Sequence, residues 1–304
     1  MAQLDDIVAE LERTLGPLEG EPVALDGGIT NRNYRALFGA GAYVIRVHGK
    51  DTELLGIDRE SEHLATRAAA RLGVAPELVY AGERCMVTRY VECAAMTEAD
   101  VAADVERVAR ALRSFHDSGV RLPRRFHVPQ LLERYAQLTH DRGGTLPADY
   151  AHAQRAAERI AQALGDAPEQ PCHNDLLPGN IIRAREGARV MIVDWEYAGM
   201  GDARFDLGNL AVNNDFDEDR EELLLRSYLG RAPRERERAS LSLMRVASDA
   251  REGAWGVLQG ALSDLDFDFA GYAREHFERM RAAVQQPSFE DTLSRATRGA
   301  SAAR

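Results

Sequence analysis

The spacing of hydrophobic and polar residues changes character along the chain. The opening stretch MAQLDDIVAELERTL repeats apolar residues at helical spacing, which predicts an acidic amphipathic helix. Short runs that alternate or are continuously apolar come next, and the Gly-rich turns between them are typical of hairpin connections. With one helix from about residue 58 to 72, residues 20–91 are expected to form a five-stranded antiparallel sheet crossed by a helix.

From Thr97 onward the apolar residues recur with a helical period. Thr97 is a suitable N-cap for a helix over 97–118, and Gly119 follows its end. The runs NIIRA and RVMIVDW interrupt the helical pattern and predict a short hairpin around REGA. Further helices are expected near 128–140, 148–164, 204–213, 217–229, 235–263 and 270–284. The final segment, QPSFEDTLSRATRGASAAR, has no evident apolar face and is expected to fray.

These patterns predict an α+β protein with two lobes. The chain has 304 residues, enough for two separate cores. We expect a β-rich N-lobe over 1–91 that binds the cofactor and a mostly helical C-lobe over 92–304 that carries catalysis and substrate. A short hinge near Arg89–Ala95 would join them.

Charge and cysteine content narrow the function. The 38 basic and 49 acidic side chains give a net charge of −11, which would repel nucleic-acid phosphates and suits a small cationic substrate better. The three cysteines stand singly, without the spacing of a disulfide framework or a zinc site, so a reducing compartment is expected. Because neither a signal peptide nor a bilayer-length apolar run is evident, we expect a cytoplasmic protein without membrane insertion.

One cluster of polar residues indicates phosphoryl transfer. In CHNDLLPGNII, which spans 172–182, Asp175 and Asn180 are five residues apart, and Asp194 follows the next apolar strand. One carboxylate can orient the attacking hydroxyl, while an amide oxygen and a second carboxylate can hold Mg²⁺ against phosphates. The alternative is that these residues only cap turns and a helix. The presence of Asp175 and Asn180 before a predicted hairpin and of Asp194 after it favours the catalytic interpretation.

At these motifs the chain resembles the choline/ethanolamine kinase family, a branch of the aminoglycoside-phosphotransferase-like kinases. The similarity extends over CHNDLLPGNII, IVDWEYAGMGDARFDLGN, WGVLQGALSDLDFDFAGYAREHF, GGITNRNYR and GKDTELLGIDRE, in that family's order. It implies a two-lobed protein-kinase-like fold with Mg²⁺ and ATP between the lobes. It also implies that Asp175 is the catalytic base, that Asn180 and Asp194 bind Mg²⁺, and that His173 and Asp206 brace the loop.

The resemblance also implies nucleotide contacts in the N-lobe. GGITNRNYR would be a phosphate loop, in which Gly28 permits a tight turn and Thr30 and Asn31 offer donors to the terminal phosphates. Taken alone, this stretch could be any hairpin turn.

Arg46 stands where most kinases keep a phosphate-pairing lysine. The choline and ethanolamine kinases resemble this chain in having arginine there, and a guanidinium suits bidentate contact with phosphate. Glu60 on the following helix is the expected partner of Arg46, with Glu62 as second choice. The alternative is an ordinary exposed arginine on a strand.

The last third of the chain supplies candidates for binding an ammonium group. Aromatic faces and a carboxylate bind such cations well. The resemblance places four aromatic residues in this pocket: Tyr197, Trp255, Phe267 and Tyr272. The alternative for aromatic residues at helical spacing is a core position, which we expect for Phe269 and Phe277.

Glu252 departs from the family pattern. The family commonly has tryptophan at this position, three residues before Trp255. A carboxylate there could pair with an ammonium and accept from a primary amine, which would favour ethanolamine over choline. Alternatively, Arg251 or Arg245 neutralises Glu252.

The expected function is therefore an ATP- and Mg²⁺-dependent kinase for the hydroxyl of a small amino alcohol, ethanolamine or choline. A kinase for thiamine or an aminoglycoside is an alternative, although Arg46 and the aromatic set disfavour the aminoglycoside. A ligand-binding pseudokinase is a third possibility, disfavoured because Asp175, Asn180 and Asp194 are all present.

Overall fold

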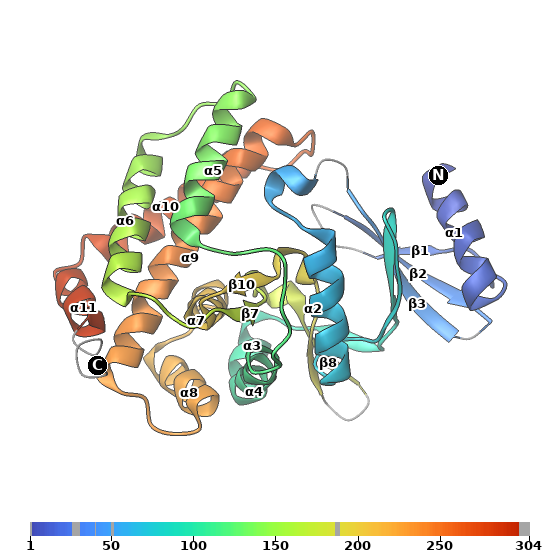
Figure 1. Ribbon diagram of the computed structural model, residues 1–304, viewed down its shortest axis with the longest axis horizontal. Helices are drawn as coiled ribbons and strands as arrows, with labels where there is room; N and C mark the ends of the chain where they lie inside the picture. Colours follow the sequence, from blue (N-terminus) through green and yellow to red (C-terminus); the bar gives the residue numbers. More distant parts are fainter. Residues whose placement is uncertain (1, 26–30, 40, 50–51, 186–188, 298–304) are drawn as a thin grey trace.

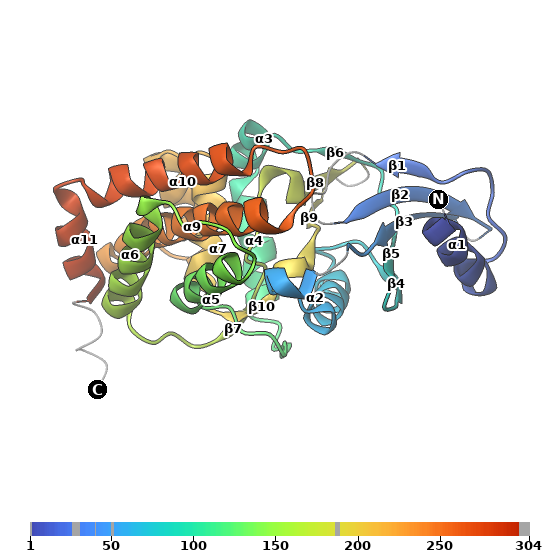
Figure 2. The same cartoon turned by 90° about the horizontal axis from the view of Figure 1, so that it is seen from above.

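The computed structural model describes residues 2–25, 31–39, 41–49, 52–185 and 189–297. The molecule is elongated, with a β-sheet and the N-terminus at one end and a mass of helices with the C-terminus at the other (Figure 1). The view from above shows the same separation, with α2 lying between the two parts (Figure 2).

The N-terminal part is an antiparallel sheet with strand order β1-β2-β3-β5-β4. Its strands are β1 Val23–Leu25, β2 Arg32–Phe38, β3 Gly41–Val47, β4 Leu78–Ala81 and β5 Cys85–Arg89. The five-stranded sheet with one crossing helix is therefore confirmed. Helix α1, Ala2–Leu15, packs Ile7 and Leu11 against Phe38 and Ile45 of the sheet, which explains its amphipathic pattern.

Helix α2, Arg59–Arg71, follows the short helix η1, Thr52–Leu55, and begins where the Asp58 side chain accepts from the Ser61 N–H. Its small residues Ala65 and Ala69 belong to the hydrophobic cluster of the helical part. The helix thus links the sheet to the rest of the molecule. The division into domains 1–91 and 92–304 stays a prediction.

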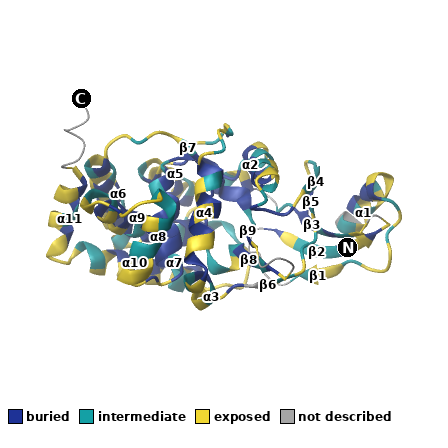
Figure 3. Cartoon of the chain, turned by 90° about the horizontal axis from the view of Figure 1, so that it is seen from below, coloured by how far each residue is buried: buried dark blue, intermediate teal, exposed yellow. Residues whose placement is uncertain are grey.

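Helix α9 is the central element of the helical part. Most of its residues from Ala239 to Gln259 are buried, because α5, α6, α7 and α10 surround it (Figures 2 and 3). The helices are α3 Glu98–Ala103, α4 Val105–His116, α5 Val128–Asp141, α6 Ala148–Leu164, α7 Ala203–Asn213, α8 Glu218–Leu229, α9 Glu235–Leu262, α10 Phe269–Val284 and α11 Ser288–Thr297.

Two small β-sheets form within the segments that connect these helices. β6 Cys93–Ala95, β8 Ile181–Ala184 and β9 Val190–Ile192 form one sheet, in which β8 and β9 are the expected hairpin. β7 Gln170–Cys172 pairs with β10 Gly199–Gly201 in the other. The short helices η2 Pro178–Asn180 and η3 Trp195–Tyr197 lie directly after the two loops that carry the predicted catalytic residues.

Two expectations about helices were wrong. The single helix over 97–118 is split into α3 and α4 at Asp104, whose carboxylate accepts from the Arg183 Nε at 2.7 Å. The C-terminal segment does not fray from residue 286 onward, because α11 buries Phe289, Leu293 and Ala296 against the α6 and α9 region. Among the described residues, no helix is long and apolar enough to cross a membrane.

Candidate active site

The loop after β7 carries Asp175 and is held from within by a neutral histidine. His173 is fully buried, its Nε2 donates to the Val193 carbonyl at 2.9 Å, and its Nδ1 accepts from the Asp175 N–H at 3.2 Å. Burial lowers the pKa of His173, which favours the neutral ring that this bonding pattern requires. His173 thus braces the loop, as expected.

Helix α7 holds the same loop from outside. Both carboxylate oxygens of Asp206 accept backbone N–H groups, from His173 and Asn174 at 2.7 Å each, and Asp206 also accepts from the His116 Nε2 at 2.9 Å. The Asn209 Oδ1 accepts from the Leu176 N–H at 2.5 Å. Asn174 has a positive φ of 69°, so this loop conformation depends on those contacts. The expected bracing role of Asp206 agrees with its contacts.

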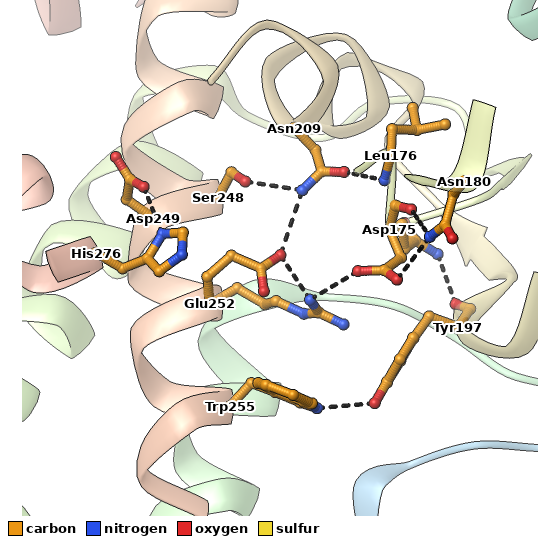
Figure 4. Close-up of polar contacts among 12 residues, drawn as sticks. Asp175, Leu176, Asn180, Tyr197, Asn209, Ser248, Asp249, Glu252, Trp255 and His276 are labelled. Carbon is orange, nitrogen blue, oxygen red and sulfur yellow. Dashed lines mark hydrogen bonds and ion pairs between the residues drawn. The ribbon is translucent and has the colours of Figure 1, made fainter. Parts of the chain in front are cut away.

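Asp175 is buried and contacts two side chains. The Asn180 Nδ2 donates to the Asp175 carbonyl at 2.8 Å and to its Oδ2 at 3.1 Å. The Arg251 Nη1 donates to the Asp175 Oδ1 at 3.3 Å. Burial raises the pKa of Asp175, whereas the charge of Arg251 opposes that shift. Figure 4 shows Asp175 and Asn180 side by side.

Asp194 lies on the neighbouring loop, in the left-handed conformation with φ of 64°. The Val193 N–H donates to the Asn180 carbonyl at 2.9 Å, which places this loop beside the end of the Asp175 loop. Asp194 forms an ion pair with the Arg46 Nη2. The Asn180 Nδ2 donates to Asp175, which leaves the Asn180 Oδ1 for a cation. This oxygen and the Asp194 carboxylate are oxygen ligands of the kind that suits Mg²⁺.

Arg46 is buried on β3, and the expected pairing with Glu60 was wrong. The Arg46 Nη1 lies 3.3 Å from the Glu62 Oε1, and the Glu62 Oε2 accepts from the Arg59 Nη1 at 2.6 Å. Glu60 is exposed. Positions two apart on a helix differ by about 200° around its axis, so Glu60 lies on nearly the opposite side of α2 from the buried Glu62. The second choice, Glu62, is the partner.

Only part of the predicted phosphate loop can be compared. Gly28 and Thr30 lie outside the described residues. Asn31 is buried, its Nδ2 donates to the Glu196 Oε2 at 2.6 Å, and its Oδ1 accepts from the Arg59 Nη2 at 3.2 Å. The Asn31 amide thus joins the sheet to the loop of Asp194, and its predicted phosphate contact stays a prediction.

A cavity of about 410 Å³ lies between the sheet and the segments that precede β8 and follow β9. Val44, Met86 and Ile182 line it with apolar surface. Polar groups from both lobes also line it: Arg46, Asn180 and Asp194. A cavity that combines apolar side chains with a guanidinium and the oxygens of Asn180 and Asp194 suits a nucleotide, whose base would lie among the apolar side chains.

Three of the four predicted pocket aromatics lie together on the other side of Asp175. The Trp255 Nε1 donates to the Tyr197 Oη at 2.8 Å (Figure 4). The rings of Trp255 and Tyr272 are 5.6 Å apart in an edge-to-face arrangement. Phe267 lies farther out, 45% exposed and 6.2 Å from the Tyr272 ring. Phe269 and Phe277 are core residues, as expected.

Glu252 is buried within this group, and Arg251 neutralises it. The Arg251 Nη1 lies 2.6 Å from the Glu252 Oε1, while the Tyr272 hydroxyl donates to the Glu252 Oε2 at 2.9 Å. Arg245 instead pairs with Glu221. Neutralisation by Arg251 is therefore observed, and the expected contact of Glu252 with an ammonium group stays a prediction.

Comparison with known proteins identifies the family. The model of the phosphotransferase enzyme family matches residues 22–242. The chain belongs to the phosphotransferase enzyme family. Ethanolamine kinase 2 of Mus musculus is 30% identical over an alignment 266 residues long, which covers 78% of this chain and 68% of the relative.

Solved structures with the same fold agree with that assignment. A choline/ethanolamine kinase family protein from Mesorhizobium loti is 32% identical, covers 98% of this chain and 100% of its own, and has a TM-score of 0.81. The choline kinase LicA from Streptococcus pneumoniae shares the fold at 23% identity, with 93% and 99% coverage and a TM-score of 0.79. The predicted resemblance and the protein-kinase-like fold are confirmed.

Sequence reasoning missed several residues of the candidate active site. Arg59 and Glu196 connect α2 to the Asp194 loop, and Arg251 contacts Asp175. Arg251 is directly beside Glu252, which the sequence already makes a candidate, within the stretch of α9 that is mostly buried. Its place next to that candidate could have identified Arg251 as well.

Proposed function

We propose that this family member is an Mg²⁺- and ATP-dependent kinase that phosphorylates the hydroxyl of a small amino alcohol, with ethanolamine as the simplest acceptor. The observation that supports it is the position of Asp175. It contacts Asn180 of the nucleotide cavity on one side and, through Arg251, the aromatic group with Glu252 on the other. An acceptor hydroxyl at Asp175 would face the terminal phosphate.

The chain's own residues would supply positioning and charge. The hydroxyl oxygen forms a bond to the γ-phosphorus as the bond from that phosphorus to the β–γ bridging oxygen breaks, and Asp175 takes the hydroxyl proton. Arg46, fixed by Glu62, would contact the phosphates. Asn180 and Asp194 would hold Mg²⁺, which supplies charge neutralisation on the phosphate oxygens when bound.

Related structures support the nucleotide. LicA has been crystallised with AMP, and a spectinomycin phosphotransferase of the same fold with ADP. The named relatives that are ethanolamine or choline kinases support a small alcohol acceptor.

The test is Mg²⁺·ATP-dependent phosphorylation of ethanolamine, choline, thiamine and kanamycin, followed by ³¹P NMR of the product. We expect a phosphate ester of an amino alcohol. The variant Asp175→Asn should lower kcat by about 10²–10⁴-fold, the usual contribution of general base catalysis, with an unchanged circular dichroism spectrum. Asp141→Asn, on the exposed surface of α5, is the matched control. Full activity in Asp175→Asn would refute the assigned role.

A further inference from the structure

Arg251 is the most unusual charged residue near the active site. It is 1% exposed, and its Nη1 alone serves both carboxylates, Glu252 at 2.6 Å and Asp175 at 3.3 Å. Its Nε and Nη2 are also buried, and neither has a hydrogen-bond partner among the described residues. Buried donors are almost always paired in folded proteins, so two unpaired donors on one guanidinium indicate a missing acceptor.

The two unpaired atoms form one recognition edge. Nε and Nη2 lie on the same side of the guanidinium, and their parallel N–H groups are the fork that binds a carboxylate with two hydrogen bonds. The guanidinium carbon of Arg251 lies 4.6 Å from the centre of the Tyr197 ring. The guanidinium that carries the unpaired fork therefore lies beside Tyr197, one of the aromatic residues predicted to bind the acceptor.

A second guanidinium adds positive charge to the same ring. The Arg124 side chain lies 5.7 Å from the Tyr197 ring centre and donates through Nη1 to the Tyr197 carbonyl. Its Nη2 is buried without a partner among the described residues. Burial and the charge of Arg251 lower the pKa of Arg124, as expected for cations brought close together.

The charges around Tyr197 are of both signs, because the guanidinium groups of Arg251 and Arg124 lie beside its ring and the carboxylates of Glu196 and Asp175 act on the same side chain. An ammonium group over that ring would meet two guanidinium groups, whereas an anion would be attracted by both. Asp175 would accept from a hydroxyl, and the Glu252 Oε2, which already accepts from the Tyr272 hydroxyl at 2.9 Å, has a second lone pair for an amine. The site thus offers complementary groups for a zwitterion that also has a hydroxyl.

We infer that the acceptor is an amino alcohol that also carries a carboxylate, bound by the Nε and Nη2 fork of Arg251. The inference rests on the proposed kinase function and narrows its substrate class. Arg251 would act as a specificity-determining residue that contacts the acceptor, and Arg124 would add to the positive potential.

Matched pairs of acceptors test the inference directly. L-Serine is ethanolamine with a carboxylate, and L-homoserine is 3-aminopropan-1-ol with a carboxylate. With Mg²⁺ and ATP, we expect kcat/KM for L-serine or L-homoserine to exceed that of its partner without the carboxylate by about 10-fold or more. The reason is that the partner would leave the buried donors of Arg251 unpaired.

Variants separate recognition from scaffolding. Arg251→Gln should bring the ratio within the pair close to one, whereas Arg251→Lys should keep part of the preference. A purely structural role would lower both members of a pair equally and leave the ratio unchanged. Arg245→Gln is the control. It removes the ion pair between Arg245, which is also on α9, and Glu221, and it should leave the ratio unchanged.

The possible outcomes are distinct. Phosphorylation of ethanolamine or choline without any of L-serine or L-homoserine would overturn this inference and leave the proposed function standing. No phosphorylation of any amino alcohol would overturn both. A rise in KM for ATP alone in Arg251→Gln would show that the fork binds nucleotide phosphate, and would also overturn the inference. If that variant does not fold, thermal shifts of the wild-type protein with each member of a pair and a non-hydrolysable ATP analogue give the same comparison.

Discussion

At the scale of single residues, the position of Glu62 between two guanidinium groups decides how Arg46 is held. Glu62 is fully buried and accepts from both Arg46 and Arg59. Removing one partner of a buried ion pair leaves an uncompensated charge, which is far more costly than losing an exposed pair. Helix α2 therefore orients Arg46, which lines the cavity proposed to bind the nucleotide.

Exchanging Glu62 and Glu60 for glutamine tests this arrangement. Glu62→Gln should lower stability by about 3 kcal/mol, the usual cost of breaking a buried pair, and should raise KM for ATP. Glu60→Gln should change stability by less than about 0.5 kcal/mol, because its side chain is exposed. Urea unfolding and steady-state kinetics measure both, and equal effects of the two substitutions would contradict the assignment.

A second residue-scale prediction concerns acid stability. Burial lowers the pKa of His48 from 6.5 to about 4, with the Arg59 charge as the next cause. As pH falls from 6.5 toward 4, the unfolded chain binds a proton that the folded chain does not, so stability should fall across this window. Above it, His48 should have no effect on the pH dependence.

The variant His48→Gln cannot be protonated and should lose less stability over the same range. Thermal unfolding between pH 7 and 4.5 provides the measurement. Parallel Tm curves for the wild-type protein and the variant would show that His48 does not contribute.

At the scale of elements, α11 shows how a weak pattern can hide a structural helix. Its buried residues Phe289, Leu293 and Ala296 have a helical spacing of three and four, but charged residues stand between them. Such a short helix is marginal alone and becomes stable only by packing on other helices. It packs on α9 and α6.

Phe289→Ala should therefore destabilise the protein by about 3 kcal/mol, since a large aromatic group leaves a cavity in the core. Ser294→Ala, at an exposed position of the same helix, should stay within about 0.5 kcal/mol of the wild type. Urea unfolding of both variants and of the wild-type protein measures the two changes in the free energy of unfolding. A neutral Phe289→Ala would mean that α11 does not support the fold.

At the scale of the whole molecule, the two lobes meet through charged side chains as well as through the cavity. The Arg46–Asp194 pair and the Asn31–Glu196 hydrogen bond both join the sheet to the Asp194 loop. A ligand that binds both sides of this junction should stabilise the molecule as a whole.

Mg²⁺ together with ATP should therefore raise Tm more than ATP with EDTA, by about 5 °C or more when the ligand is near 100 times its Kd. In Asp194→Asn the difference between the two conditions should vanish, while Asp166→Asn, an exposed control, should keep it. Differential scanning fluorimetry measures all three proteins. An unaltered difference in Asp194→Asn would argue against this residue as a Mg²⁺ ligand.

The sequence alone determined the features that depend on local spacing. The five strands, the boundaries of most helices and the family followed from apolar periodicity and from motifs such as CHNDLLPGNII, because these patterns act over a few residues. The juxtaposition of Asp175, Asn180 and Asp194 could also be predicted, since a short hairpin joins their loops.

The tertiary structure decided what depends on the rotation of helices and on contacts between distant segments. The rotation of α2 selected Glu62 instead of Glu60, and the packing of α11 supplied a buried face that its composition did not reveal. The position of Arg251 depends in the same way on how α9 packs against the loop of Asp175, 76 residues away in sequence. Sequence patterns do not encode which side of a buried helix meets which loop, so only the fold could place a guanidinium with an unpaired fork beside the predicted acceptor site.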